Sequence, residues 1–156
     1  MTTPLTQFTR LMDEAFNAGD LTVLDELVSP DFVEHQFETP RHPGRAVGPA
    51  GVARVVSELR AGADDFHLVI EGASVTGDTV WARLRGTGTD TGGQLGQPPT
   101  GKAFAITVID VARFREGRMV EHWGVPDRLG LLLQLGLFGG AQGPGGRVPS
   151  TARSAP

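Results

Sequence analysis

Asp110 is a carboxylate on a strand face that is otherwise apolar. Side chains alternate between the two faces of a strand, so every second residue from Phe104 to Phe114 shares one face. A carboxylate in such surroundings is either paired with another group or used in acid–base chemistry. Asp110 is therefore the first candidate for a catalytic residue. The other members of this face are Phe104, Ile106, Val108, Ala112 and Phe114.

The residue opposite Asp110 depends on the turn that follows this strand. A shift of one residue in strand pairing exchanges the two faces. A three-residue loop over residues 115–117, closed by a left-handed glycine, pairs Phe114 with Arg118. By the same count, His122 lies opposite Asp110.

A two-residue loop of Glu116 and Gly117 would instead place Trp123 opposite Asp110. Glu-Gly is a poor match to the Asn-Gly or Asp-Gly that such turns favour, so the longer loop is preferred. We therefore predict a catalytic pair of Asp110 and His122. Burial would raise the carboxyl pKa and a charged histidine would lower it, so the two groups would titrate together.

Composition limits the classes of partner. The 156 residues suit one domain, and 39% hydrophobic with 21% charged residues is ordinary globular usage. A formal net charge of −4 and the lack of a basic run argue against nucleic acid, so a hydrophobic small molecule is the expected ligand. The absence of cysteine excludes thiolate metal sites and thiol nucleophiles. No signal peptide or membrane-length apolar run is visible, which predicts a cytoplasmic protein without a membrane partner.

The N-terminal third is predicted to be helical with one short strand. Apolar residues recur every three or four positions in residues 4–18, 21–28 and 49–60, which predicts three helices with buried faces. Residues 32–37 are predicted to form a strand between the second and third helices.

The rest of the domain is predicted to be mainly β. Strands at residues 66–75 and 79–88, joined through Gly77 and Asp78, precede the hairpin at residues 104–125. A leucine-rich helix follows Pro126. Helices followed by an antiparallel meander predict an α+β fold, in which three N-terminal helices close one side of a cone-shaped curved antiparallel sheet around a pocket.

The predicted domain is residues 1–138, and the remainder of the chain has a different composition. Residues 139–156 are mostly Gly, Pro, Ser, Ala and Arg, which bury too little apolar surface to offset the entropy of ordering. We predict a disordered tail there.

Four stretches of the chain resemble one known family. They are AFNAGDLTVLDELVSPDFVEH, GTGTDTGGQLGQPPTGK, IDVARFREGRMVEHWGVPD and LGLLLQLG. They are similar to the SnoaL-like polyketide cyclases, or ester cyclases, whose fold is shared with ketosteroid isomerase and nuclear transport factor two. The resemblance covers roughly residues 5–138. It implies a cofactor-free acid–base site inside the cone, used by the prototype for an aldol ring closure on an aromatic polyketide ester, and a homodimer formed through the outer sheet face.

The chain departs from the family at one important position. The acid–base aspartate of the prototype lies two residues after the histidine of the second hairpin strand, which is Gly124 here. Polar cavity residues of the prototype's preceding strand map to Val108 and Asp110, and only Asp110 is polar. The resemblance therefore leaves Asp110 as the best acid–base candidate, with His122 to orient or share the proton.

Further residues are predicted to bind the substrate. Glu34 and His35 are adjacent on the early strand, so only one of them can face the pocket. We favour His35, whereas alignment with the prototype points to Glu34, and the choice stays open. Trp81 could stack on a flat polycyclic substrate. Two apolar residues of the Asp110 face, Phe104 and Val108, complete the predicted binding set.

A metal site is the less favoured interpretation. His35, Asp110 and His122 would make the two-histidine, one-carboxylate set of non-haem iron sites. The family's usual chemistry needs no metal, and no helix carries paired ligands at a known zinc spacing, so we predict neither metal nor cofactor. The absence of tyrosine removes the donor of a ketosteroid isomerase site.

Two other functions compete with ring closure. Relatives on this fold open epoxides with a carboxylate held by arginine, which would require Arg83 or Arg85 to approach Asp110. A non-catalytic small-molecule-binding protein is the second alternative, and Gly124 is the feature that suggests it. A free side of Asp110 would distinguish an enzyme from a binding protein.

Overall fold

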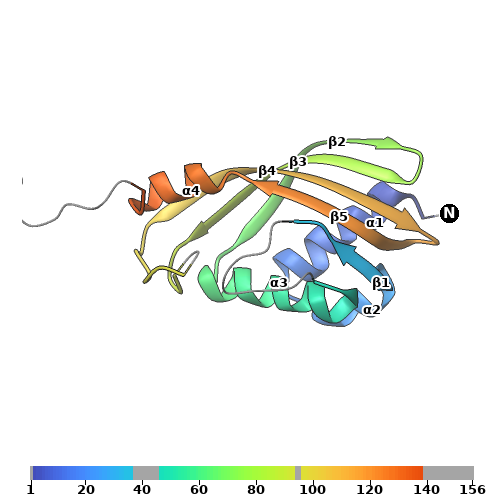
Figure 1. Cartoon of the computed structure of the whole chain (residues 1–156), viewed down its shortest axis with the longest axis horizontal. Helices are drawn as coiled ribbons and strands as arrows, with labels where there is room; N and C mark the ends of the chain where they lie inside the picture. The colour runs from blue at the N-terminus through green and yellow to red at the C-terminus, as the bar shows by residue number, and fades with distance from the viewer. Residues whose placement is uncertain (1, 37–45, 94–95, 139–156) are drawn as a thin grey trace, which may run out of the picture.

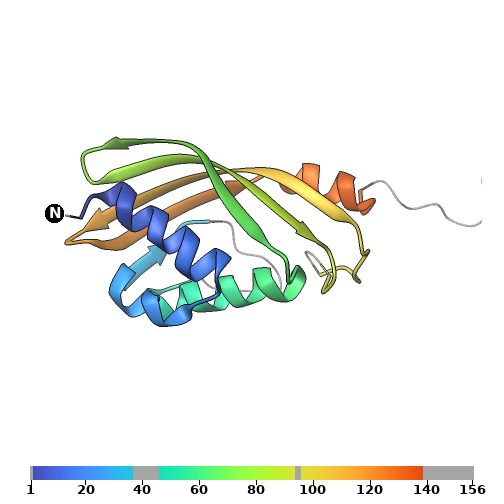
Figure 2. The ribbon, with the colours of Figure 1, turned by 180° about the vertical axis from the view of Figure 1, so that it is seen from behind.

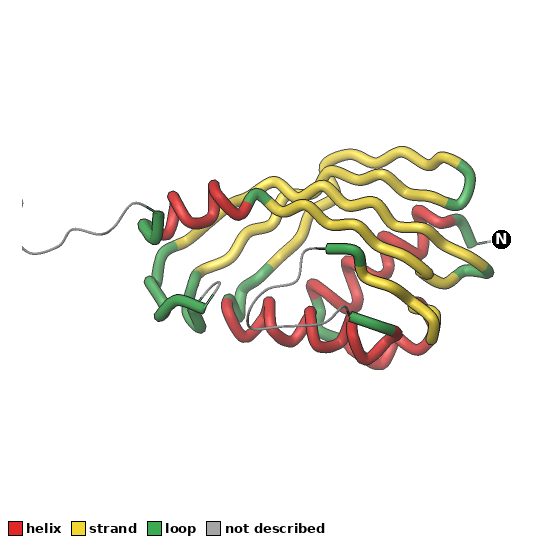
Figure 3. Tube along the Cα trace, viewed as in Figure 1, coloured by secondary structure: helices red, strands yellow, loops and turns green. Residues whose placement is uncertain are grey.

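A curved five-stranded sheet with helices beneath it makes up the fold (Figure 1). The computed structural model describes residues 2–36, 46–93 and 96–138. Figure 3 shows the N-terminal helices and the third helix below the strands, whereas the C-terminal helix lies at one end of the sheet. The α+β class and the curved sheet over N-terminal helices are thus confirmed.

The first helix begins where the sequence predicts. Helix α1, Pro4–Arg10, is capped by Thr3, whose hydroxyl accepts the Thr6 amide at 3.1 Å. It continues as a π-helical stretch, Leu11–Asn17, before the chain turns at Gly19. Figure 2 shows this continuous helix crossing the underside of the sheet.

The second helix is shorter than predicted, while the third matches. A 3₁₀ turn, Leu21–Val23, leads into α2, Leu24–Leu27, and the chain becomes extended at Val28. Helix α3 spans Gly48–Gly62. Pro30 lies inside the strand that follows α2, and an edge strand tolerates a proline because one side of its backbone is unpaired.

The sheet is mixed rather than a pure meander. Its strands are β1 Val28–Glu34, β2 His67–Thr76, β3 Thr79–Thr89, β4 Ala103–Arg115 and β5 Arg118–Pro126. Their order is β1-β5-β4-β3-β2, with β1 parallel to β5 and the other pairs antiparallel. The prediction of an all-antiparallel sheet was wrong at β1, which also begins four residues before the predicted start. Residue 37, the predicted end, lies outside the described residues.

The β4–β5 turn is the two-residue type, so the predicted three-residue loop was wrong. Arg115 pairs with Arg118, and Glu116 and Gly117 have φ values of 51° and 76°. Positive φ at both central positions is the geometry of a type I′ turn, which twists in the same sense as the strands. Glu116 adopts it although glutamate rarely does, so the twist of the hairpin outweighs the local preference.

A β-bulge then changes the register again. The pairing shifts after Phe114, leaving Val120 as an extra residue on β5. Asp110 consequently lies opposite Gly124, not opposite His122 or Trp123 as the two loop models predicted. His122 pairs with Ala112, two residues from Asp110 on the same face, so the histidine reaches Asp110 diagonally.

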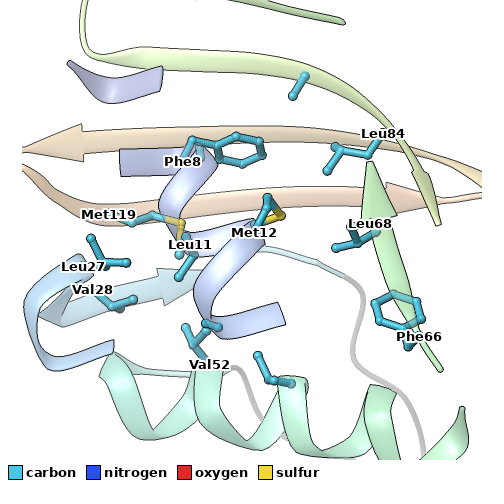
Figure 4. Packing of buried hydrophobic residues seen from close by; sticks show 14 of the residues in the cluster. Phe8, Leu11, Met12, Leu27, Val28, Val52, Phe66, Leu68, Leu84 and Met119 are labelled. Atoms are coloured by element: carbon cyan, nitrogen blue, oxygen red, sulfur yellow. The ribbon is translucent and has the colours of Figure 1, made fainter. Parts of the chain in front are cut away.

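The core lies between the helices and the underside of the sheet (Figure 4). Phe8, Leu11 and Met12 from the N-terminal helix contribute to the same buried cluster as Leu84 of β3 and Val52 of α3. The alternation predicted for β4 is confirmed, since this buried side of the sheet includes the apolar face that carries Asp110. Buried members of that face are Phe104, Ile106, Ala112 and Phe114.

Helix α4, Arg128–Leu135, follows β5 as predicted. Asp127 caps it by accepting the Gly130 amide at 2.8 Å, and Gly136 ends it with φ of 75°. Two of its leucines are buried and two are exposed. The predicted tail, residues 139–156, lies outside the described residues. Among the described helices none is long and apolar enough to cross a membrane.

Candidate functional site

Three polar side chains from β1, β4 and β5 meet on the inner face of the sheet. His122 Nδ1 lies 2.9 and 2.8 Å from the two oxygens of Glu34, and its Nε2 lies 3.3 Å from Oδ1 of Asp110. The imidazole therefore bridges two carboxylates. We call Glu34, His122 and Asp110 the inner triad.

Strand pairing brings the inner triad together. Glu34 is registered directly against His122 in the parallel β1–β5 pair. Asp110 approaches from β4 across the bulged hairpin. The predicted association of Asp110 with His122 is therefore present in space, although the register that was expected to produce it is not.

Burial and hydrogen bonding act in opposite directions on His122. Burial alone would lower the pKa of His122, because a charged ring is poorly solvated there, but hydrogen bonds to Asp110 and Glu34 raise it to about 10. The side chains of His122, Glu34 and Asp110 are 14%, 15% and 9% exposed. At neutral pH the triad holds an imidazolium between two carboxylates, and both ring N–H groups are directed at carboxylate oxygens.

Of the two adjacent β1 candidates, Glu34 faces the inner triad and His35 faces the other way. The His35 ring stacks on Trp123, with centroids 4.5 Å apart and planes 6° from parallel. Its Nε2 lies 3.2 Å from Glu121, and its backbone amide donates to the His122 carbonyl at 2.8 Å. The interpretation that His35 enters the pocket does not fit this geometry, because one-residue alternation sends it outward once Glu34 points in.

Glu121 completes an outer network with Arg113. Arg113 Nε donates to Glu121 at 2.6 Å, and this bond, followed by the one from His35, holds the pKa of Glu121 below its usual value against the effect of burial. We call Arg113, Glu121, His35 and Trp123 the outer network. It lies on the opposite face of the strands that carry the inner triad.

The remaining predicted binding residues divide between the two faces. Phe104 and Val108 share the face of Asp110, as predicted. Trp81 lies on the outer face, because its neighbour Ala82 is the residue paired with Asp110, and Trp81 is 52% exposed. The structure therefore does not bring Trp81 to the inner triad.

The arginines required for an epoxide-type site are also on the outer face. Arg83 and Arg85 alternate with Ala82 and share the face of Trp81. Arg83 forms an ion pair with Glu71 of β2, and Arg85 is exposed. Neither guanidinium group is placed beside Asp110.

The iron-type ligand set is not assembled either. His35 is on the opposite face from Asp110 and His122, so the three residues cannot converge on one ion. In the described part of the chain, no group of three His, Cys, Asp or Glu side chains is arranged to hold a metal.

Gln36 is a polar residue of this site that the sequence interpretation missed. Its backbone amide donates to Glu34 at 2.9 Å. A methyl group added to Gly124 would lie 2.7 Å from Oε1 of Gln36, which puts the Gln36 side chain beside the triad. The strand predicted over residues 32–37 gave the available signal, because its residues 34 and 36 would share a face. In the structure β1 ends at Glu34, and Gln36 lies at a bend just beyond it.

The described residues line an open pocket of about 680 Å³ that is separate from the inner triad. Arg113 and Glu121 of the outer network line it, and the inner triad does not. The predicted pocket inside the cone remains a prediction. The other residues of this cavity are Ser29, Asp31, Val33, Arg115, Glu116, Arg118 and Val120.

Comparison with known proteins identifies a family and relatives in sequence. The family model described as SnoaL-like polyketide cyclase matches residues 6–135. Aklanonic acid methyl ester cyclase DauD of Streptomyces sp. strain C5 is 32% identical over 139 residues, covering 85% of this chain and 82% of that protein. Nogalonic acid methyl ester cyclase of Streptomyces nogalater is 32% identical over 126 residues, covering 80% and 92%.

Solved structures agree with these sequence matches. Wild-type IdmH from Streptomyces antibioticus superposes with a TM-score of 0.74 at 35% identity, over 85% of this chain and 98% of that one. TsrD from Streptomyces laurentii gives a TM-score of 0.73 at 28% identity, over 84% and 96%.

Proposed function

Because the chain belongs to the SnoaL-like polyketide cyclase family and is an enzyme of the cyclase type, we propose that it closes a ring in an aromatic polyketide methyl ester by an aldol-type reaction without a cofactor. The observation that carries this proposal is Asp110. His122 holds one of its oxygens, and the other, Oδ2, has no hydrogen-bond partner among the described residues.

Asp110 acts as the general base and then as the general acid. Oδ2 takes a proton from a carbon next to a carbonyl group, and the electrons of the broken C–H bond form an enolate. The enolate carbon attacks a second carbonyl carbon, a C–C bond forms, and the resulting alkoxide takes the proton back from Asp110. The product is an isomer of the substrate, so no oxidant, reductant or metal enters the balance.

His122 and Glu34 prepare Asp110 for this cycle. The imidazolium fixes Oδ1 and places a positive charge beside the carboxylate, and Glu34 fixes the imidazolium from the other side. Both N–H groups of His122 face carboxylates, so His122 acts on the substrate through Asp110. Phe104 and Val108 supply apolar contacts on the same face.

Epoxide opening is the less supported alternative because Arg83 and Arg85 lie on the outer face, away from Asp110. The free oxygen of Asp110 also favours catalysis over simple ligand binding, since a purely structural carboxylate is expected to have its oxygens saturated by protein donors.

A homodimer is the second part of the proposal. Two exposed tryptophans, Trp81 and Trp123, flank the half-buried Val111 on the outer face, so that the three residues follow one another across three strands. Such a row is suited to burial against a second copy of the chain, as the family resemblance implies. A cytoplasmic location stays a prediction of the sequence.

The test is incubation of the purified protein with aklanonic acid methyl ester and with nogalonic acid methyl ester. The expected product has the mass of the substrate and one additional ring, detected by chromatography and NMR. Failure to convert either ester, or turnover that depends on an added metal or redox cofactor, would contradict the proposal.

A further inference from the structure

The space beside Gly124 is filled by polar groups from three strands or strand ends. A methyl group on Gly124 would lie 2.7 Å from Oε1 of Gln36, 2.9 Å from Cε1 of His122 and 3.2 Å from Oδ1 of Asp110. The glycine therefore leaves room for three side chains to approach one point. Oε1 of Gln36 and Oδ1 of Asp110 are therefore separated by at most the sum of 2.7 and 3.2 Å.

The Gln36 side chain is the member of this group whose hydrogen-bonding capacity is unused. Its backbone amide is held by Glu34 at 2.9 Å, which fixes where the side chain starts. Neither polar atom of the side chain has a partner within the described part of the chain. An amide carries two N–H donors and can turn either its nitrogen or its oxygen toward a ligand by rotation about its last torsion.

Ring closure needs a donor that the inner triad does not provide. Removal of a proton next to a carbonyl group puts negative charge on the carbonyl oxygen, and a nearby N–H group stabilises that charge. The two N–H groups of His122 are directed at Glu34 and Asp110. Asp110 itself is an acceptor until it has taken the proton.

We propose that the side-chain amide of Gln36 donates a hydrogen bond to the substrate oxygen that becomes anionic when Asp110 removes the proton. The reaction in this inference is taken from the proposed function. The choice of Gln36 rests on the convergence of side chains at Gly124. The inference assigns Gln36 as a catalytic residue and Gly124 as the position that lets its amide reach the site.

The experiment compares Gln36→Met, which keeps the length of the side chain and removes both donors, with Gln36→Asn, which keeps a shorter amide. Loss of one oxyanion donor reduces kcat by about a hundredfold or more, so kcat should fall by that factor in Gln36→Met with a change in KM of no more than a few-fold. Exchange of the substrate's acidic C–H hydrogen in D₂O should fall by the same factor. Gln36→Asn should recover part of the loss.

A binding measurement tests the donor role of Gln36 independently of ring closure. The phenolate of 1,8-dihydroxyanthraquinone presents an anionic oxygen on a flat polycycle, and Gln36→Met should bind it about tenfold more weakly than the wild type. The pKa of His122, followed by NMR, should stay near 10, because Asp110 and Glu34, which raise it, are both retained. Val75→Met, at an exposed position on β2, is the control and should match the wild type.

The outcomes separate the two proposals. A weaker phenolate complex in Gln36→Met, with no turnover even by the wild type, would support the donor role of Gln36 and overturn ring closure. An unchanged dissociation constant, or no binding of the probe to the wild type, would overturn the role of Gln36. So would kcat of Gln36→Met within threefold of an active wild type.

Discussion

The two faces of the β1–β5 pair each carry a histidine next to a glutamate, but a different third partner. On the inner face, His122 lies between Glu34 and a second carboxylate, Asp110. On the outer face, His35 shares Glu121 with the guanidinium of Arg113. The side chains of the outer pair are 25% exposed, against 14–15% for the inner pair.

The third partner decides what each pair can do. A second carboxylate holds a proton on His122 and leaves negative charge in excess, so Asp110 remains an acceptor for a substrate proton. An arginine instead keeps Glu121 ionised and saturated with donors. The inner triad is suited to proton transfer, whereas the outer network fixes the end of β1, from which Glu34 projects.

The largest contrast is expected between Asp110→Asn and Glu121→Gln. Asparagine keeps the size of the side chain but cannot take the proton, so kcat should fall by a hundredfold or more. Glu121→Gln keeps the length of the side chain and an oxygen acceptor for Arg113, so the end of β1 stays in place and kcat should change by no more than about twofold. Steady-state turnover of the methyl ester measures both, with circular dichroism to show that each variant is folded. Full turnover by Asp110→Asn would remove Asp110 as the base.

Glu34→Gln should give an intermediate effect. One of the two carboxylates around His122 is neutralised, so the pKa of His122 should fall from about 10, and kcat should fall by about tenfold because Glu34 acts through His122. The titration of His122 by NMR measures the first effect. A pKa that stays near 10 in this variant would mean that Asp110 alone holds the proton.

The sequence predicted which residues belong to the inner face of β4 better than it predicted which residues they pair with on β5. Alternation along β4 placed Asp110 on the apolar face, because that pattern depends on the period of a strand alone. The opposite partner was wrong because it depends on turn type and on a bulge at Val120, and neither leaves a reliable local signal.

The choice between Glu34 and His35 also needed the fold. Adjacent strand residues face opposite ways, so a choice of face requires knowledge of which strand lies beside β1 and in which direction. The pairing is parallel to β5, a contact between residues almost ninety positions apart along the chain. Once that register is known, the inward placement of Glu34 follows from alternation, whereas Gln36 lies at a bend beyond the end of β1.

The two faces should also limit stability at opposite ends of the pH scale. The folded pKa of His122 is raised from 6.5 to about 10, so its contribution is complete below about pH 6.5 and is lost as pH rises toward 10. The folded pKa of Glu121 is lowered from 4.5, so its contribution is present above that value and is lost as pH falls. Thermal melts of His122→Gln should lose part of the alkaline slope, and those of Glu121→Gln part of the acid slope. The reverse assignment would contradict the comparison.

The smallest effect on turnover is expected from the outer apolar row, although its effect on assembly should be clear. Trp81 is 52% exposed and lies beside Val111, which in turn pairs with Trp123. If a second copy covers this row, Trp81→Glu buries a charge in the contact and should convert a dimer into the 16.5 kDa monomer, as measured by light scattering.

The control variant is Val75→Glu, which places the same charge on the opposite face of the neighbouring strand. Val75 pairs with the buried Val80, so this variant should leave the dimer intact. Turnover within about twofold of the wild type in both variants would show that the inner triad works within one chain. A wild-type monomer would mean that the outer face has another role.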